Sequence, residues 1–216
     1  MIKTPAAHGT IRSGIEYWPS YVDILTTVLM VFVLQNFLQT TLNIDSFESA
    51  RLREEQRRLA GMMQKEFQEE TARHKVTLDD SKLNMLQVRF SEEILFTSGD
   101  YHLAAKGREA LGKCARALRT GAGSVDFKQI EVEGHTDKQP LNRLIYPRDN
   151  WELSTARAIE VVRFMMERGI PPDRLSAGGY AEFHPVEDSR WNQSHNRRIE
   201  LRVLFSTPDQ LPGRGR

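Results

Sequence analysis

The sequence is short of the residues that would give it disulfides, a metal site or a strong electric field. Cys114 is its single cysteine among 216 residues, so no disulfide can form within the chain. Its six histidines are scattered without the spacing of metal ligands, which predicts no metal site. Lys and Arg (30) nearly cancel Asp and Glu (29), and a formal net charge of +1 offers no field that would gather nucleic acid. Function must therefore be sought in local features.

The motifs of common enzyme chemistry are missing as well. No nucleophile elbow, glycine-rich phosphate loop or pair of carboxylates at catalytic spacing occurs, since Gly178 and Gly179 are a lone pair in a predicted turn. We therefore expect a protein that is not an enzyme and that needs no cofactor.

One apolar segment is long enough to cross a membrane. The 21 residues from Trp18 to Leu38 contain a single side chain that is charged at neutral pH, Asp23, and about 20 residues at 1.5 Å each span the hydrocarbon core of a bilayer. A cleaved signal peptide is the rival interpretation, but the segment is too long and no small-x-small cleavage site follows it. We therefore expect an uncleaved transmembrane helix over residues 17–42.

The charges that flank this segment predict its orientation. Lys3 and Arg12 precede it, whereas Asp45 and Glu48 follow it. Because basic residues stay on the cytoplasmic side, the tail 1–16 is expected in the cytoplasm and the rest of the chain outside.

Residues 43–82 read as a helical linker. Leu52, Leu59, Met63 and Phe67 recur near helical spacing among Glu, Arg and Gln residues. This apolar stripe is thin, which favours a solvated spacer or a weak parallel coiled coil over a strong zipper.

From Leu83 onward the pattern alternates between strands and helices, which predicts an α/β (α+β) sandwich over residues 83–206 with crossover helices on one face. The tail 207–216 is rich in Pro and Gly and is expected to be flexible. The expected strands are 83–90, 127–137, 174–182 and 196–205, and the expected helices are 104–118 and 151–169.

Several motif blocks within this region occur in a characteristic order. Residues 133–137 read EGHTD, residues 150–158 read NWELSTARA, and residues 196–200 read NRRIE, with Gly178-Gly179-Tyr180 between the last two. Over residues 85–205 the chain resembles the OmpA/MotB C-terminal domain. The resemblance implies an OmpA-like fold with a pocket for the meso-diaminopimelate of peptidoglycan, in which Asp137 and Arg157 match the ligand-binding pair.

The chemistry of these two residues agrees with that ligand. One end of diaminopimelate is a zwitterion, so a carboxylate suits its ammonium group and a planar guanidinium suits its carboxylate. The alternative is that Asp137 and Arg157 pair only with each other. Asn150 is placed to cap the helix that follows, and Asn196 and Arg197 are expected to line the pocket or to be merely solvated.

Asp23 needs an explanation, because an acid in a spanning helix carries an insertion penalty of roughly 2.5–3.5 kcal/mol. It could snorkel to the headgroups, or it could carry protons between the two sides of the membrane. Thr26 and Thr27 could support its carboxyl group or bond back to their own helix.

Residues 18–26 read WPSYVDILT and resemble the start of a MotB-type helix, whose aspartate carries the protons of a rotary motor. The resemblance implies a homodimer of this chain within five copies of a multi-span MotA- or ZorA-like partner in the bacterial inner membrane. This stretch of sequence is most similar to the ZorB subunits of Zorya anti-phage systems, and after them to flagellar MotB. A passive tether to the cell wall is the remaining alternative.

Overall fold

The computed structural model describes residues 18–122, 127–141, 144–186 and 193–206. The chain divides into two compact units, Met1–Phe47 and Glu48–Arg216. The predicted tails 1–16 and 207–216 lie outside the described residues.

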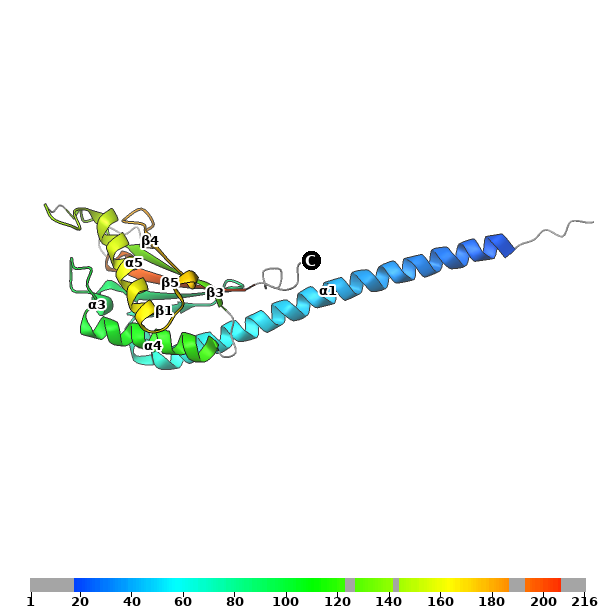
Figure 1. Cartoon of the computed structure of the whole chain (residues 1–216), viewed down its shortest axis with the longest axis horizontal. Coiled ribbons are helices and arrows are strands. Elements are labelled where there is room, and N and C mark those ends of the chain that lie inside the picture. The colour runs from blue at the N-terminus through cyan, green and yellow to red at the C-terminus, as the bar shows by residue number, and fades with distance from the viewer. Residues whose placement is uncertain (1–17, 123–126, 142–143, 187–192, 207–216) are drawn as a thin grey trace, which may run out of the picture. The chain divides into compact units, whose positions relative to one another are not determined.

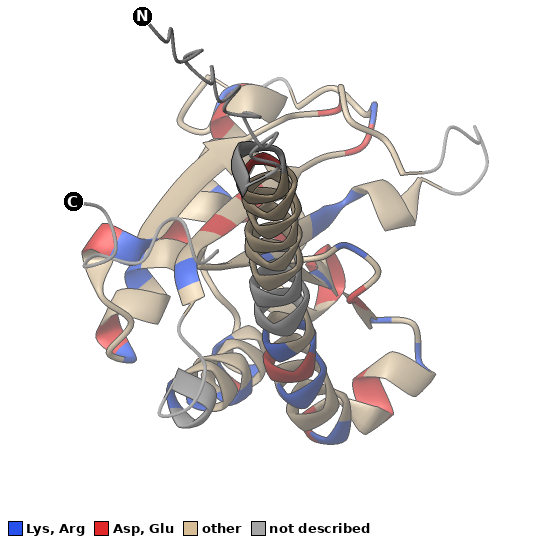
Figure 2. Ribbon diagram, turned by 90° about the vertical axis from the view of Figure 1, so that its right-hand side faces the viewer, with Lys and Arg blue, Asp and Glu red and all other residues tan. Residues whose placement is uncertain are grey.

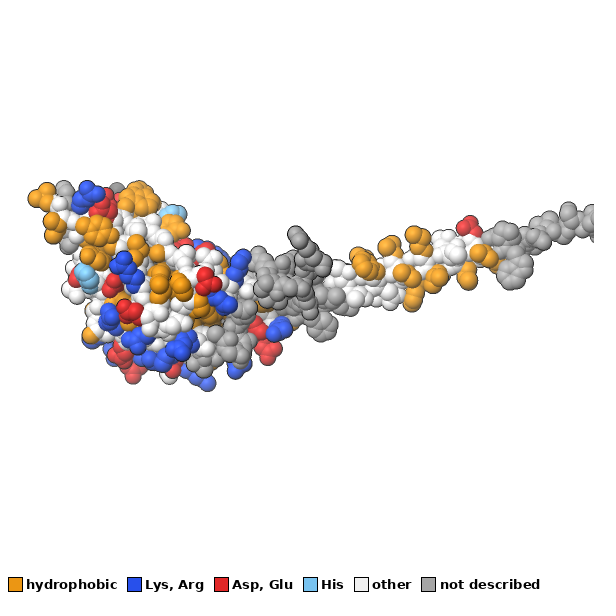
Figure 3. Space-filling model, viewed as in Figure 1, with side chains coloured by type: hydrophobic (Ala, Val, Ile, Leu, Met, Phe, Trp, Pro, Cys, Tyr) orange, Lys and Arg blue, Asp and Glu red, His pale blue; other side chains and the backbone are white. Residues whose placement is uncertain are grey.

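The first unit contains the beginning of helix α1 (Trp18–Glu66). Within the described part of the chain, one segment, Tyr21–Thr41, is long and apolar enough to cross a membrane, and none of it is buried within the protein. Hydrophobic side chains are spread around this segment (Figure 3). The segment lies within the predicted span of residues 17–42.

The later part of α1, from Glu48 on, belongs to the second unit and carries many charged residues (Figure 2). It is not the predicted solvated spacer, because Leu59 and Met63 on α1 and Phe67 just after it are all at least 99% buried and belong to the core of this unit. Phe67 also packs edge-on against Phe90, with ring centroids 5.5 Å apart. The thin apolar stripe is therefore a packing surface.

Gln56, which interrupts that stripe in the sequence, fastens the helix to the rest of the unit. Its side chain is 97% buried, and its Nε2 donates to the carbonyl oxygens of Asp80, Lys82 and Met85 at 2.8–2.9 Å. A buried amide that is hydrogen-bonded in this way fixes the register of α1 without an apolar contact.

The segment predicted as a helical linker also contains a strand. After α1 come a short helix, α2 (Gln68–Ala72), and strand β1 (Val76–Asp79), which pairs with β2 (Met85–Ser91). At four residues, β1 is too short for an alternating pattern to reveal it against the preceding helical signal.

The sheet has five strands in the order β1-β2-β5-β3-β4. The remaining strands are β3 (Phe127–His135), β4 (Leu175–Gly179) and β5 (Arg198–Phe205). β3 and β4 are parallel and the other neighbours are antiparallel. The parallel pair requires a crossover, which α5 (Asn150–Glu167) provides.

One face of the sheet packs against helices, as Figure 1 shows for α4 (Ala105–Ala122) and α5. A short helix, α3 (Glu92–Leu95), joins β2 to the loop before α4, and 3-10 turns η1 (Pro172–Arg174) and η2 (Ser194–Asn196) precede β4 and β5. Cys114 lies fully inside this core, and burial raises the pKa of its thiol to about 12, so it behaves as a small hydrophobic residue. The predicted fold class is confirmed.

Candidate ligand-binding site

A cavity of about 450 Å³ lies at the end of β3, beside the N-terminus of α5. Four of its twelve lining residues are charged, two of them acidic and two basic. The lining consists of Glu92, Ser98, Gly99, Thr136, Asp137, Gln139, Pro140, Leu141, Asn150, Leu153, Arg157 and Arg197.

Close packing between β3 and α5 brings the two predicted residues to this cavity. A Cβ atom on Gly134 would lie 2.1 Å from the carbonyl oxygen of Ser154, so only glycine permits this approach. Asp137 follows the end of β3, and Arg157 lies one turn after Ser154 on α5. The sequence predicts that the helix packs back on the strand, and the glycine explains how closely it does.

Asp137 and Arg157 are connected through two other side chains rather than directly. Arg197 Nη1 donates to Asp137 Oδ2 at 2.7 Å, and Arg197 Nε donates to Glu92 Oε2 at 2.6 Å. Arg157 Nη2 donates to the other oxygen of Glu92. We name the four residues Asp137, Arg197, Glu92 and Arg157 the pocket quartet. The alternative in which Asp137 and Arg157 pair only with each other is therefore wrong.

Further contacts hold Arg157 in place. Its side chain is 98% buried, its Nε donates to the carbonyl oxygen of Asp100 at 2.9 Å, and its guanidinium lies 5.1 Å from the centre of the Phe96 ring. Burial lowers the pKa of Arg157, and the Glu92 carboxylate opposes this effect. The hydrogen bond to Asp137 raises the pKa of Arg197. Since arginine titrates far above neutral pH, both guanidiniums stay charged.

The two asparagines differ in their positions. Asn150 lines the cavity, and its Nδ2 donates to the carbonyl oxygens of Asp137 (3.3 Å) and Gln139 (3.0 Å). It does not cap α5: Asp149 is the N-cap, and its Oδ1 accepts from Glu152 N at 2.8 Å. Asn196 is outside the cavity lining, because its Oδ1 is turned to the backbone N–H of Val186 at 2.9 Å.

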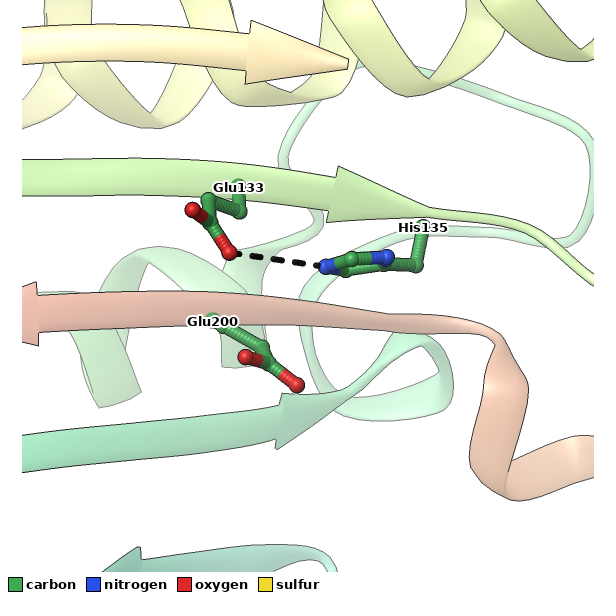
Figure 4. Close-up of side chains that lie close together, drawn as sticks. All are labelled: Glu133, His135 and Glu200. Carbon is green, nitrogen blue, oxygen red and sulfur yellow. Dashed lines mark ion pairs between the residues drawn. The ribbon is translucent and has the colours of Figure 1, made fainter. Parts of the chain in front are cut away.

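A second buried group of charged residues lies on the side of the sheet away from the helices. Figure 4 shows the side chains of Glu133, His135 and Glu200 close together. Their possible ligand atoms all lie within 4.8 Å of one another. The two carboxylates are already compensated: Glu133 accepts from Arg202, and Glu200 accepts from Arg89 and Arg198. Three guanidiniums beside two carboxylates oppose a further cation, so this group fits a metal poorly. We name these six residues the sheet network.

His135 is the unusual member of the sheet network. It is 96% buried, and neither ring nitrogen has a hydrogen-bond partner among the described residues. Its Nε2 lies 3.8 Å from Glu133 Oε2, which is an ion-pair distance rather than a hydrogen bond. Its ring stacks on Tyr180 at 5.3 Å between centroids, so packing holds it in place.

Asp23 is exposed on the apolar segment of the first unit. Thr26 Oγ1 donates to the carbonyl oxygens of Val22 and Asp23 at 2.9 Å, and Thr27 Oγ1 donates to the carbonyl oxygen of Asp23 at 2.8 Å. Both threonines therefore bond back to their own helix, which is the second of the two predicted possibilities. The Asp23 carboxyl group has neither hydroxyl as a partner.

Comparison with known proteins identifies a domain within the second unit. Residues 95–198, which contain most of the cavity lining, match the OmpA family. The chain carries an OmpA-like domain.

Curated relatives of the OmpA-like domain include motility proteins. The chain is 36% identical over 118 residues to the uncharacterized protein YtxE of Bacillus subtilis, covering 53% of this chain and 46% of the relative. It is 35% identical over 80 residues to motility protein B of Helicobacter pylori, covering 36% of this chain and 30% of the relative. It thus spans less than half the length of these relatives.

Solved structures extend the similarity beyond the residues of the family match. A MotB-like protein from Desulfovibrio vulgaris has a TM-score of 0.64 at 26% identity, covering 73% of this chain and 99% of that one. The cell wall anchor of the type VI secretion system from Pseudomonas aeruginosa has a TM-score of 0.58 at 28% identity, covering 67% and 97%. The OmpA-like domain therefore has MotB-like homologues and structural neighbours.

Glu92 is the residue of the site that the sequence analysis did not select. It lies three residues before the matched segment, in a stretch predicted to change from strand to loop. Glu92 is followed directly by Glu93, and nothing in their spacing relative to other residues marks Glu92 as part of a binding site. Only its burial and its two arginine partners show that it belongs to the site of the OmpA-like domain.

Proposed function

We propose that this chain anchors a MotB-type stator to the cell wall from the bacterial inner membrane. Its OmpA-like domain binds peptidoglycan, and the apolar segment of α1 spans the membrane once with the N-terminus in the cytoplasm. The pocket quartet carries this proposal, since it presents carboxylates and guanidiniums together in one cavity. That arrangement suits the zwitterionic end of meso-diaminopimelate.

Binding to purified sacculi tests the first part of the proposal. We expect full-length Asp137→Ala and Arg157→Ala to lose sedimentation with sacculi, because each removes a charged partner of the ligand. Asp173→Ala and Arg163→Ala are matched controls, since both residues are exposed on the same domain and lie outside the cavity. If the two pocket variants sediment as well as the wild type, the pocket assignment is wrong.

The second part of the proposal concerns Asp23, to which we assign the transfer of protons. Its isolation as the one Asp, Glu, Lys, Arg or His side chain between Trp18 and Leu38 supports this role. A surrounding ring of five multi-span MotA- or ZorA-like subunits, holding two copies of this chain, would shield it from lipid. The chain then has an anchoring and ion-carrying role rather than an enzymatic one. Protons are the driving ion, and no cofactor is required.

Proton flux tests this role. In vesicles that contain the chain and its copurified partner, we expect Asp23→Asn to abolish dissipation of an imposed pH gradient while sedimentation with sacculi is unchanged. Glu54→Gln, an exposed position further along α1, serves as the control. Full proton flux through Asp23→Asn would leave only the passive tether, in which residue 23 also tolerates Leu.

The process that the motor powers is a finer part of the proposal. We infer a ZorB-like subunit of a Zorya anti-phage system, with a flagellar MotB-type subunit as the alternative, on the resemblance of residues 18–26. Copurification followed by mass spectrometry identifies the partner, and phage-infection and swimming assays of Asp23→Asn separate the two processes.

A further inference from the structure

Glu92 lies at the centre of the pocket quartet. Its carboxylate accepts from both guanidiniums, Arg157 through Oε1 and Arg197 through Oε2, and it is 94% buried. Its backbone N–H donates to the carbonyl oxygen of Arg197 at 3.0 Å, so backbone and side chain both tie α3 to that residue. Glu92 therefore holds the two cationic groups of the cavity in fixed positions.

The same carboxylate sets the charge of the cavity. Among its lining residues, Asp137 and Glu92 carry two negative charges, and Arg157 and Arg197 carry two positive ones. The net charge is zero only because Glu92 is present. Without it, a single carboxylate would face two guanidiniums and the cavity would attract any anion.

A neutral cavity of this kind favours one class of ligand. A ligand end that brings an ammonium group and a carboxylate together leaves the charge balanced, and each of its groups meets an opposite charge. A ligand with carboxylates alone has to compete with Glu92 for the guanidiniums and leaves an uncompensated negative charge in a largely buried site. Each guanidinium has five N–H donors, so Arg157 and Arg197 retain donors for a ligand carboxylate while they hold Glu92.

We propose that Glu92 is a specificity-determining residue that restricts the cavity to zwitterionic ligand ends and rejects simple carboxylates. This inference rests on the proposed wall-binding function and deepens it. It assigns the selectivity to a residue outside the Asp137–Arg157 pair and outside the segment that matches the OmpA family. Glu92 acts by positioning Arg157 and Arg197 and by compensating part of their charge. This role does not require contact with the ligand.

The probes for the test are meso-diaminopimelate and pimelate. Both have the same seven-carbon chain with two carboxylates, but pimelate has no amino groups. Isothermal titration calorimetry on the full-length chain in detergent gives the ratio of their dissociation constants. We expect the wild type to prefer diaminopimelate, and Glu92→Gln to reduce this preference at least tenfold by binding pimelate more tightly.

Two further variants keep the test independent of folding defects. Arg197→Gln makes the lining net negative, so its preference for diaminopimelate over pimelate should rise rather than fall. Glu92→Asp retains the charge and should restore most of the wild-type preference. Glu93→Gln is the matched control, because this neighbour on α3 is exposed and pairs with Lys75 at 3.3 Å.

The outcomes separate the inference from the function on which it rests. A wild-type chain that binds neither probe nor sacculi overturns both. If the wild type binds diaminopimelate and Glu92→Gln keeps the wild-type ratio in a folded protein, the role of Glu92 is refuted while the wall-binding pocket stands. An unchanged or lowered ratio in Arg197→Gln would refute it in the same way.

Discussion

The pocket quartet and the sheet network are built from similar kinds of charged side chain, but they differ in which of these side chains line a cavity. Both combine two carboxylates with arginines, and the four acidic residues are all more than 90% buried as whole residues: Glu92, Asp137, Glu133 and Glu200. All four residues of the quartet line one cavity of about 450 Å³. In the sheet network, Arg89 and Arg198 line another cavity, of about 410 Å³, but Glu133, His135 and Glu200 line neither of the two. Burial and charge therefore do not distinguish a binding site from a structural network here. What distinguishes them is that carboxylates and guanidiniums face one cavity together in the quartet, whereas only guanidiniums reach a cavity in the sheet network.

The two networks also differ in how their carboxylates are compensated. In the quartet, Glu92 accepts from two arginines, and each of these guanidiniums lines the cavity and has further N–H donors besides the one that Glu92 accepts. In the sheet network, Glu200 accepts from Gln87 as well as from two arginines, which leaves little capacity for a ligand. A saturated network stabilises the fold, and an incompletely saturated one can exchange partners.

The largest expected effect separates the two networks by function. Arg157→Ala should abolish binding to sacculi and lower the free energy of unfolding by about 3–5 kcal/mol, because it leaves a buried carboxylate with one partner fewer. Urea unfolding of the full-length chain and sedimentation with sacculi measure the two quantities. Full binding by the folded variant would show that the quartet, too, is only structural.

The next prediction concerns the centre of the sheet network. Glu200→Gln removes the charge that compensates Arg89 and Arg198, so the free energy of unfolding should fall. Because Arg89 is partly exposed, we expect the decrease to lie near the lower end of about 3–5 kcal/mol. Sedimentation of the folded fraction with sacculi should be unchanged. A loss of binding that exceeds the loss of folded protein would contradict the distinction between the networks.

Gly134 lies between Glu133 and His135 of the sheet network on β3, and it packs against Ser154, one turn before Arg157 of the quartet on α5. Its substitution should therefore affect both networks. In Gly134→Ala the new methyl group meets the backbone of Ser154 at 2.1 Å, which should cost about 1–3 kcal/mol and move Arg157 away from Asp137. In the control Gly112→Ala on helix α4, the new methyl group makes only an ordinary contact, with Arg116 Nη1 at 3.7 Å, and should stabilise the protein by about 0.5–1 kcal/mol. Thermal unfolding of both variants checks the opposite signs.

The last expected effect is an acid dependence that belongs to the sheet network. Burial alone would raise the pKa of Glu133, but the contacts with His135 and Arg202 lower it from 4.5 to about 2. At 3.8 Å, His135 is too distant for a hydrogen bond, so Arg202 accounts for the larger share. Because the native state favours the ionised form, this stabilisation is complete above about pH 4.5 and is lost as the pH falls toward 2.

Urea unfolding at pH 6 and at pH 3 measures this dependence. Glu133→Gln should differ more from the wild type at pH 6 than at pH 3, whereas Glu69→Gln, an exposed control, should show no such change. An equal difference at both pH values would mean that the charge of Glu133 contributes nothing to stability.

Much of the fold follows from local patterns in the chain. The apolar run after Trp18, the alternation in residues 85–91 and 198–205 and the helical spacing in 150–167 each depend on neighbours in sequence, so they predict the elements that the structure shows. In the predicted linker 43–82 the helix is confirmed as far as Glu66, but the solvated spacer is wrong, because a stripe of four apolar residues gave no indication that they enter a core. Strand β1 was missed because four residues form no clear pattern.

The site shows the same division between local and long-range information. Its motif residues Asp137, Asn150, Arg157 and Arg197 could be named from the sequence, since each belongs to a recognisable block. The sequence could not reveal that Glu92 belongs to the site or that Asn196 lies outside the cavity lining. Both facts depend on contacts between residues up to 105 positions apart, as in the Glu92–Arg197 pair. Local preference determines which elements form, but only close packing of those elements decides which charges are buried together and which remain open to a ligand.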